Sequence, residues 1–466
     1  MRIERHTPGG WWLEEAPSPE ARPPLEGRAE ADVAVIGGGF TGLWTAWQLI
    51  EAGASVVLLE GGVCGHGPSG RNGGFCESMW MLAPTLRARF GDPAARDLLV
   101  ASSETVGSIG RWCEDNDVDA WFSQSGYMCV STAEAYDAVG TEAAAAAAAL
   151  GAPDRVVALD RVALRRRCAS PVFRQGVLIP DFATLQPARL GLGLRRRLLE
   201  RGARIHEGSR VRSLRASAGG VEAVTAHGSV RAQAAVLAVG PAARGLPVLR
   251  SRLTVTSSHI VLTEPVPDVL EDLGWTGGEC ITDGRTLIHY FRTTRDGRIA
   301  FGWGGGRLAY GARLNGHVEV DPTLAATVAR DLIRVFPALE GRRITHAWGG
   351  PVDVSPSHTP QVGTLPGVPV HFAFGYTGNG VGPSHLVGRA LASLALDRRD
   401  DVTRLAIVGS DAGAWVPPEP VAWLGGSAVR SALVRAEHAR EAGRPVDPVT
   451  RVVCAAPRAL GMHLAR

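Results

Sequence analysis

The pattern of apolar and polar positions predicts a strand, a helix and a second strand near the start of the chain. ADVAVIGG, which begins at residue 31, is a continuous apolar run typical of a buried strand. GGGFTGLWTAWQLIEAG follows with helical spacing and ends at Gly53, and SVVLLE is the next apolar run. This order predicts a βαβ unit.

The predicted βαβ unit carries a dinucleotide-binding signature. Gly37, Gly39 and Gly42 satisfy GxGxxG, and Glu60 closes the second strand eighteen residues after Gly42. The glycines allow a tight turn and close approach of a pyrophosphate to the helix N-terminus, and Glu60 can accept a hydrogen bond from a ribose hydroxyl. The predicted contacts of the nucleotide half are Gly37, Gly39, Phe40, Thr41, Gly42, Glu60 and Gly61.

The segment after Glu60, GGVCGHGPSGRNGGFCES, has neither a strand nor a helix period. A glycine-rich segment of this kind can bring successive backbone N–H groups to one edge of an isoalloxazine ring without obstruction by side chains. We therefore predict FAD as the cofactor; a surface loop is the alternative that these residues leave open. The predicted flavin contacts are Ser69, Gly70, Arg71, Asn72, Gly73 and Gly74.

Later segments fit a cofactor domain that is assembled from distant parts of the chain. Residues 203–216 alternate as a strand, and residues 230–243 form a buried strand that ends in the Gly-Pro turn at Gly240. Near the C-terminus, HFAFGYTGNGVGPSHLVGRALASLAL predicts a strand, a glycine turn and a helix. The start of that helix would face negative charge on the reduced flavin.

Composition narrows the chemistry. The chain has 466 residues and no lysine, so all 49 basic residues are arginine, which excludes the Schiff-base chemistry of pyridoxal-phosphate enzymes and class I aldolases. The net charge of +3 is too small to indicate a nucleic-acid partner. The seven cysteines form no CxxC pair, and neither a signal peptide nor a long apolar run is present. We therefore expect a cytoplasmic protein without a membrane span, a disulfide framework or a metal site.

The order of five segments along the chain indicates a family: VIGGGFTGLWTAWQL, SGRNGGF, HYFRTTRDGRIAFGWGG, AWGGPVDVSPSHTPQVG and GYTGNGVGPSHLVGRALA. This order resembles that of the D-amino-acid-oxidase-like FAD-dependent oxidoreductases, and most of all the γ-glutamylputrescine oxidase branch. The resemblance implies an α/β fold, with a discontinuous Rossmann-like FAD-binding domain and an α+β substrate domain whose largely antiparallel sheet covers the flavin. It also implies oxidation of a C–N bond in an amine or amino-acid-like substrate to an imine that hydrolyses, with O2 reoxidising the flavin to give hydrogen peroxide.

The resemblance also implies binding residues and domain boundaries. It places Val211 beside the adenine, and it places the turn of Gly378, Asn379, Gly380 and Val381 at the pyrimidine end of the flavin. Residues 1–30 are rich in Pro and Glu, and this composition predicts an irregular arm. The rest divides into an FAD-binding domain at 31–90, 155–245 and 349–398, a substrate domain at 91–154 and 246–348, and a helical extension at 399–466.

Relatives that tether FAD use a histidine in the turn that corresponds to SGRNGG. Arg71 occupies that place here, so we expect non-covalent FAD. His66, five residues earlier, is the competing candidate for a tether, although an ordinary loop histidine is the preferred interpretation.

Two departures from the family pattern bear on the reaction. Val352 stands where amino-acid oxidases hold the substrate carboxylate with an arginine, which favours an amine, or an acid whose anion lies farther out, over an α-amino acid. Ala300 stands where some members carry a lysine that assists oxygen reduction. Either an arginine or a histidine stabilises superoxide, with His289 preferred over His259 and Arg71, or the enzyme is a dehydrogenase that uses another electron acceptor.

The hairpin TLIHYFRTTRDGRIAFGW offers the best substrate contacts. Alternation places His289 and Phe291 on one face and Tyr290 and Arg292 on the other, so only one pair can face the flavin, and we favour His289. A histidine satisfied within the sheet, and an ion pair for Arg292, are the structural alternatives. The predicted substrate-site residues are His289, Trp348, Phe75, Tyr127 and Arg292.

Two other functional classes stay open at the level of sequence. The chain could retain FAD without turnover, or it could be a nicotinamide-dependent reductase. The arginine-rich C-terminal segment at 418–443 has helical spacing, and we expect it to be a packing helix rather than a membrane attachment.

Overall fold

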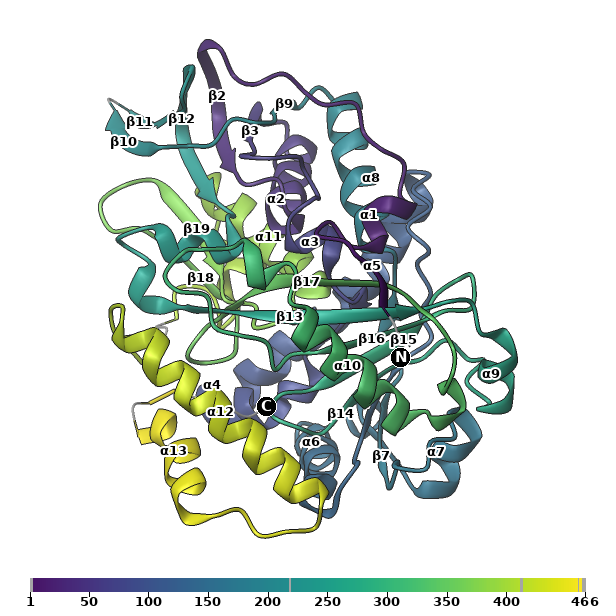
Figure 1. Ribbon diagram of the computed structural model, residues 1–466. Coiled ribbons are helices and arrows are strands. Elements are labelled where there is room, and N and C mark those ends of the chain that lie inside the picture. The colour runs from purple at the N-terminus through teal and green to yellow at the C-terminus, as the bar shows by residue number, and fades with distance from the viewer. Residues whose placement is uncertain (1–2, 218, 411–413, 460, 463–466) are drawn as a thin grey trace.

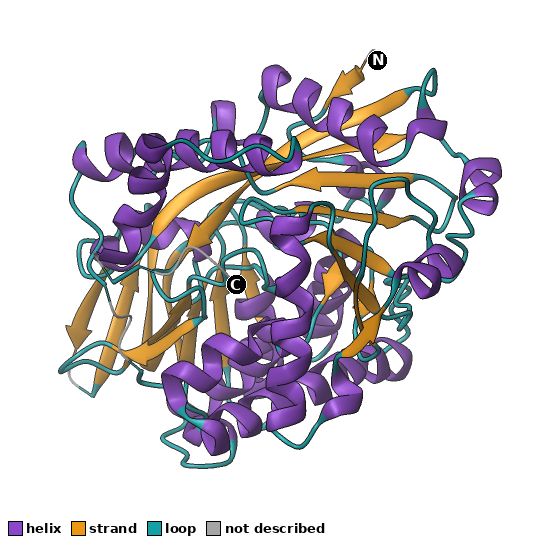
Figure 2. Ribbon diagram, turned by 90° about the horizontal axis from the view of Figure 1, so that it is seen from below, coloured by secondary structure: helices purple, strands orange, loops and turns teal. Residues whose placement is uncertain are grey.

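Two large sheets and the helices around them make up the protein (Figure 1). The computed structural model describes residues 3–217, 219–410, 414–459 and 461–462. An eight-stranded sheet lies in the upper part of Figure 1, and the long strands of a nine-stranded sheet cross the middle of the molecule. Figure 2 shows from below that the strands of the two sheets run in different directions and that helices flank them.

The eight-stranded sheet has a parallel centre. Its strands are β2 (Gly27–Ile36), β3 (Val56–Leu59), β9 (Arg204–His206), β10 (Ser213–Ser217), β11 (Gly220–Val224), β12 (Gly228–Leu237), β18 (Gln361–Thr364) and β19 (Val370–Phe374). β12 pairs in parallel with β2 and β19, β2 with β3, and β3 with β9. All four residues of β3 are buried, as expected for a parallel strand that is covered on both faces.

The nine-stranded sheet is largely antiparallel. Its order is β1 (Ile3–His6), β17 (Ile344–Val354), β13 (Thr254–Thr263), β16 (Ile299–Trp303), β15 (His289–Thr293), β14 (Cys280–Asp283), β5 (Tyr127–Val130), β7 (Gly176–Ile179) and β6 (Val157–Leu159). Only the β1–β17 and β5–β14 pairs are parallel among its described strands. A two-stranded ribbon, β4 (Phe75–Cys76) with β8 (Ala183–Thr184), completes the strand pairing.

Thirteen helices pack against these sheets and against one another in the described part of the chain. They are α1 (Trp11–Glu15), α2 (Phe40–Glu51), α3 (Pro68–Arg71), α4 (Ala83–Phe90), α5 (Asp92–Asp115), α6 (Asp137–Ala149), α7 (Arg161–Arg167), α8 (Pro187–Glu200), α9 (Pro267–Asp272), α10 (Pro322–Val335), α11 (Val381–Ala395), α12 (Val421–Glu441) and α13 (Pro448–Ala459). Helices α2, α5, α8 and α11 share the largest apolar core. Helix α10 packs on β13, β16 and β17, and α12 and α13 lie side by side at the lower left of Figure 1. Among the described helices, none combines the length and the hydropathy needed to cross a bilayer.

The architecture confirms the predicted fold class, a Rossmann-like cofactor domain joined to a domain with a largely antiparallel sheet. The prediction of an irregular arm at 1–30 is wrong, because this segment contains β1, α1 and the start of β2. Two buried tryptophans explain why this segment is regular. Trp11 and Trp12 are both buried, and the ring of Trp12 packs edge-on against that of Trp348, with centroids 6.4 Å apart.

The chain crosses between the two sheets more often than expected. β6 and β7 lie within residues 155–245, a range predicted to belong to the cofactor domain, yet both belong to the nine-stranded sheet. β17 carries residues 349–354 into the same sheet, and α5, expected in the substrate domain, packs against α11. The single strand predicted at 203–216 is two strands, β9 and β10.

Candidate active site

One cavity of about 1700 Å³ lies between the two sheets and is lined by residues of both, together with α12 and α13. A pocket for one drug-sized ligand is roughly 300–1,000 Å³, so this volume offers room for a large cofactor and a second ligand. The predicted cofactor residues that line it are Gly37, Gly39, Phe40, Thr41, Glu60, Gly61, Ser69, Arg71, Asn72, Gly73, Val211, Gly240, Gly378, Asn379, Gly380 and Val381.

The glycines of the first turn fit a dinucleotide for steric reasons. Gly37 has φ +108°, and a Cβ there would lie 2.3 Å from the carbonyl oxygen of Ala238. A Cβ on Gly42 would lie 1.9 Å from the oxygen of Gly37, so Gly42 holds α2 against β2 without itself lining the cavity. Helix α2 begins at Phe40 with its N-terminus at the cavity, which favours negative charge such as a pyrophosphate.

Glu60 lies at the carboxyl end of β3 and braces the loops on either side. Its Oε2 accepts from the N–H of Gly38 and its Oε1 from the N–H of Gly62, both at 2.7 Å. Val211 and Gly240 follow other strands of the same sheet and meet Glu60 at the cavity. Crevices at the carboxyl ends of parallel strands are where open α/β sheets bind nucleotides.

The turn SGRNGG joins the two sheets. Residues 68–71 form the single helical turn α3, where the sequence predicted no regular structure. Asn72 fixes the turn, because its Oδ1 accepts from the N–H of Gly74 at 2.7 Å and its Nδ2 donates to the Ser69 carbonyl at 2.9 Å. Arg71 donates to Glu319 Oε1 at 2.9 Å, and Trp348 Nε1 donates to the carbonyl of Arg71 at 2.8 Å. Gly70 and Gly74 support the turn from outside the cavity.

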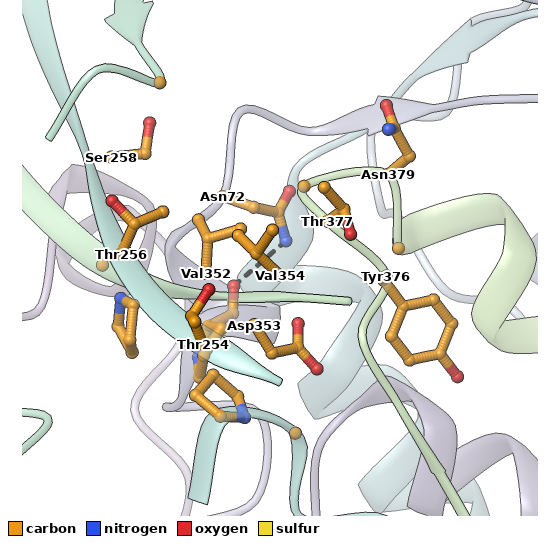
Figure 3. A pocket seen from close by; sticks show the side chains of 18 of the residues that line it. Asn72, Thr254, Thr256, Ser258, Val352, Asp353, Val354, Tyr376, Thr377 and Asn379 are labelled. Atoms are coloured by element: carbon orange, nitrogen blue, oxygen red, sulfur yellow. Dashed lines mark hydrogen bonds between the residues drawn. The ribbon is translucent and has the colours of Figure 1, made fainter. Parts of the chain in front are cut away.

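The C-terminal glycine turn forms the opposite wall. Figure 3 shows Tyr376, Thr377 and Asn379 on one side of the pocket, across from the hydroxyl-bearing residues of β13. The hydroxyls of Tyr376 and Thr41 lie 2.7 Å apart, so this turn is tied to α2. Helix α11 starts at Val381, whose N–H donates to Glu77 Oε1 at 3.2 Å.

The wall contributed by β13 and β17 presents hydroxyls and valines. Thr254, Thr256 and Ser258 alternate along β13 and line the cavity (Figure 3). Thr256 lies directly opposite Val352 in the β13–β17 register, and Val352 also lines the cavity. On these two strands, which the structure describes in full, no arginine or lysine lines the cavity.

Tyr290 completes this wall from β15. Its hydroxyl lies 2.7 Å from the Ser258 hydroxyl, and Ser258 donates to the carbonyl of Trp303 at 3.0 Å. Burial raises the pKa of Tyr290 to about 12, although the hydrogen bond to Ser258 acts in the opposite direction. Tyr290 is therefore a neutral phenol at physiological pH.

Asp353 is a buried carboxyl at the cavity. Its side chain is 7% exposed and accepts from the N–H of Gly375 at 2.5 Å. Burial raises the pKa of Asp353 to about 6, against the backbone hydrogen bonds that lower it. Sequence reasoning missed this group, because Asp353 stands in a run of otherwise ordinary strand residues.

The prediction that His289 faces the cavity is wrong. Its side chain is 0% exposed and lies on the other face of β15, where Nδ1 is 2.8 Å from Asp283 Oδ2 and Nε2 is 3.1 Å from Asp331 Oδ2. His259 is also buried away from the cavity, with Nε2 3.2 Å from Ser257 Oγ. The predicted alternation of side chains along β15 is present, but Tyr290 and not His289 faces the cavity.

Arg292 supports the site from behind. Its Nη1 donates to the carbonyls of Gly74 and Leu185, at 3.0 and 2.6 Å, so it holds the end of the SGRNGG turn rather than an ion pair or a substrate. Phe75, Tyr127 and Trp348 line the cavity, as expected for apolar walls. Sequence reasoning missed Thr254, Thr256, Ser258, Tyr290 and Arg430; for the β13 residues the signal was polar alternation in TVTSSHI.

Comparison with known proteins identifies the family. A family model described as FAD dependent oxidoreductase matches residues 32–394. γ-Glutamylputrescine oxidoreductase of Escherichia coli is 30% identical over 377 residues, which cover 78% of this chain and 83% of that protein. Glycine oxidase from Geobacillus kaustophilus has a similar fold, with a TM-score of 0.66, 19% identity, and coverage of 80% of this chain and 96% of the oxidase. L-proline dehydrogenase from P. horikoshii has a TM-score of 0.67 and 18% identity, over 82% of this chain and 96% of the dehydrogenase. The chain belongs to the FAD-dependent oxidoreductases, and the prediction of FAD as its cofactor is confirmed.

Proposed function

We propose that this protein is an FAD-dependent amine oxidase, which converts the C–N bond of an amine or amino-acid-like substrate to an imine. When bound, FAD accepts the two electrons and the hydrogen that leave the carbon. Water then adds to the imine, and the C–N bond breaks to give a carbonyl product and an amine or ammonia. O2 takes up the two electrons with two protons and becomes hydrogen peroxide.

The observation that carries the proposal is the pair of hydroxyls on Tyr290 and Ser258. Ser258 has a single proton and donates it to Trp303, so the Tyr290 proton is directed to Ser258. The Tyr290 oxygen therefore keeps a lone pair for an N–H of the substrate. This arrangement orients an amine without removing its proton, and oxidation of a neutral amine needs orientation more than acid–base catalysis.

The wall around Val352 supports an amine rather than an α-amino acid. Thr254, Thr256 and Ser258 offer hydroxyls there, Asp353 offers a carboxyl, and no cation of β13 or β17 is present to hold a carboxylate beside the reacting carbon. The relative from Escherichia coli is named for an amine substrate, which agrees with this preference.

We further propose that FAD is held without a covalent bond. Arg71 and Asn72 occupy the end of the α3 turn, and both are engaged in hydrogen bonds to the protein. His66 lines the cavity as a half-buried side chain, and burial lowers its pKa. Acid precipitation tests this point: yellow colour in the supernatant supports non-covalent FAD, and colour in the pellet means that His66 or another side chain is linked to it.

The electron acceptor is proposed to be O2, with a dehydrogenase as the second candidate. Of the three cations considered, His259, His289 and Arg71, only Arg71 lines the cavity. Its ion pair with Glu319 offsets its charge, which favours the dehydrogenase. Stoichiometric hydrogen peroxide during amine turnover would support the oxidase, and rapid turnover with an artificial acceptor but not with O2 would support the dehydrogenase.

A further inference from the structure

A further arginine reaches the cavity from the C-terminal helix α12, outside the segment that matches the family model. Arg430 lines the cavity, and its Nε donates to the carbonyls of Gly305 and Gly306 at 2.8 and 2.6 Å. Its guanidinium carbon lies 5.7 Å from the centroid of the Trp303 ring. The hydrogen bonds from Nε and the contact with the Trp303 ring hold the guanidinium group in place.

The outer edge of this guanidinium group is available. Among the described residues, neither terminal nitrogen of Arg430 has a hydrogen-bond or ion-pair partner. The neighbouring charges do not compensate it, because Arg307 and Asp321 pair with each other at 2.6 Å. One positive charge with two parallel donor nitrogens therefore remains at the cavity, and this geometry matches a carboxylate.

The turn that anchors Arg430 also places it close to the amine-binding wall. Thr256 Oγ1 donates to the same Gly306 carbonyl at 3.4 Å, and Ser258 donates to the carbonyl of Trp303, two residues before Gly305. Two residues of chain span at most about 7 Å. The Tyr290–Ser258 pair and Arg430 thus stand at two neighbouring points of one wall.

We propose that Arg430 binds a carboxylate of the substrate, and that the substrate class is an amine whose carboxylate lies at the far end of a chain of about four to six carbons. The amine nitrogen then meets Tyr290, while Arg430 takes the anion that the β17 wall cannot hold. This assignment depends on the amine oxidation proposed above only for the position of the nitrogen; the anion site itself is testable without turnover.

Calorimetric titration of the FAD-loaded protein with pentanoate and with pentanamide tests the site, because the two probes have similar shape and only one is an anion. We expect the wild-type protein to bind pentanoate at least about tenfold more tightly, the gain of a charge-assisted hydrogen-bond pair. Arg430→Gln should abolish this preference while its amide still donates to Gly305, and Arg430→Lys should retain part of it. Arg313→Gln is the matched control, since Arg313 lines the cavity but lies exposed against the ring of Tyr310, and the preference should persist there.

Equal binding of the two probes by the wild-type protein, absence of pentanoate binding, or an unchanged preference in Arg430→Gln would each overturn the assignment. Anaerobic flavin bleaching by 5-aminopentanoate and by pentylamine separates this inference from the proposed function. If both amines bleach the flavin equally in the wild type and in Arg430→Gln, the amine oxidation stands and the anion site fails. If neither these amines nor any other amine bleaches it, the proposed function fails, whatever the titrations show.

Discussion

The hydroxyl of Tyr290 lies 2.7 Å from the hydroxyl of Ser258, and both side chains line the cavity. Ser258 is committed as a donor to Trp303, so the Tyr290 oxygen is the acceptor that remains for an amine. The pair comes from strands β15 and β13, which are separated in the sheet by β16. Its geometry is therefore set by the sheet rather than by a mobile loop.

Replacing Tyr290 with Phe should lower kcat/KM for the best amine about tenfold, because one hydrogen bond to the substrate nitrogen is lost. The flavin content should stay that of the wild type, since the change keeps the ring that packs beside Gly73 and removes only the hydroxyl. Tyr310→Phe is the control, with a side chain that is 42% exposed on the surface. Steady-state kinetics with both variants decide the matter, and unchanged kinetics in Tyr290→Phe would remove this residue from the substrate site.

Replacing Glu60 with Ala should raise the Kd for FAD at least about tenfold. The change removes the acceptor of the Gly38 and Gly62 N–H groups and with it the shape of both loops, besides the predicted contact to a ribose. Fluorescence titration of the apoprotein with FAD measures the effect. Glu104→Ala, on the exposed side of α5, should bind FAD like the wild type; an equal loss in both variants would mean that the effect is not local to Glu60.

Replacing Gly42 with Ala should destabilise the protein and empty it of flavin. The new Cβ would stand 1.9 Å from the Gly37 oxygen, so α2 must move away from the turn that it supports. Gly107→Ala is the matched helix control, because its Cβ would meet only the far end of the Arg111 side chain at 3.3 Å. Alanine there should leave the melting temperature unchanged or raise it slightly, because alanine is favoured over glycine in a helix by about 1 kcal/mol. A flavin-loaded Gly42→Ala protein would show that this packing is not required.

Replacing His289 with Gln should destabilise the protein by about 3 kcal/mol, because Asp283 and Asp331 would lose the buried cation that lies between them. Burial opposes ionisation of the ring, but the two carboxylates outweigh it and raise the pKa of His289. Stabilisation by a group with a raised pKa is complete below its unfolded pKa of about 6.5 and is lost as the pH rises through the folded value.

The difference in unfolding free energy between the wild type and His289→Gln should therefore be largest near pH 6 and shrink in alkaline solution. Denaturant unfolding at several pH values measures it, and the rate of flavin reoxidation by O2 should be the same in both proteins. A slowed reoxidation with undiminished stability would restore His289 to the flavin site and contradict its placement behind the sheet.

The features that the sequence predicted well are local. The βαβ unit, Glu60 and the glycine turn at Gly378 each lie within one short segment, and each segment reaches the cavity. The face of β15 could not be predicted, because it depends on Asp331, 42 residues from His289 in the chain, which fixes the histidine behind the sheet. Alternation gave two possible faces, and only tertiary packing selects Tyr290 for the cavity.

The sequence also did not predict that the C-terminal helix α12 contributes a residue to the cavity. Residues 418–443 show a helical period, but nothing in that period indicates that Arg430 reaches the glycine turn after β16. The assignment of residues 155–245 to one domain failed for a similar reason. β6 and β7 are short strands that complete the distant edge of the nine-stranded sheet, and a short strand carries little information about its partner.

The most direct test of the account is an anaerobic panel of amines and amino acids, mixed with the FAD-loaded protein and followed by the loss of flavin absorbance. We expect amines to bleach the flavin, amines with a distant carboxylate to do so at the lowest concentrations, and α-amino acids to react weakly. The reasons are the proposed hydrogen bond from the amine nitrogen to Tyr290 and the lack of an arginine or lysine on β13 and β17, the two described strands beside Val352. A flavin that no amine reduces, or one that α-amino acids reduce better than every amine, would contradict the account.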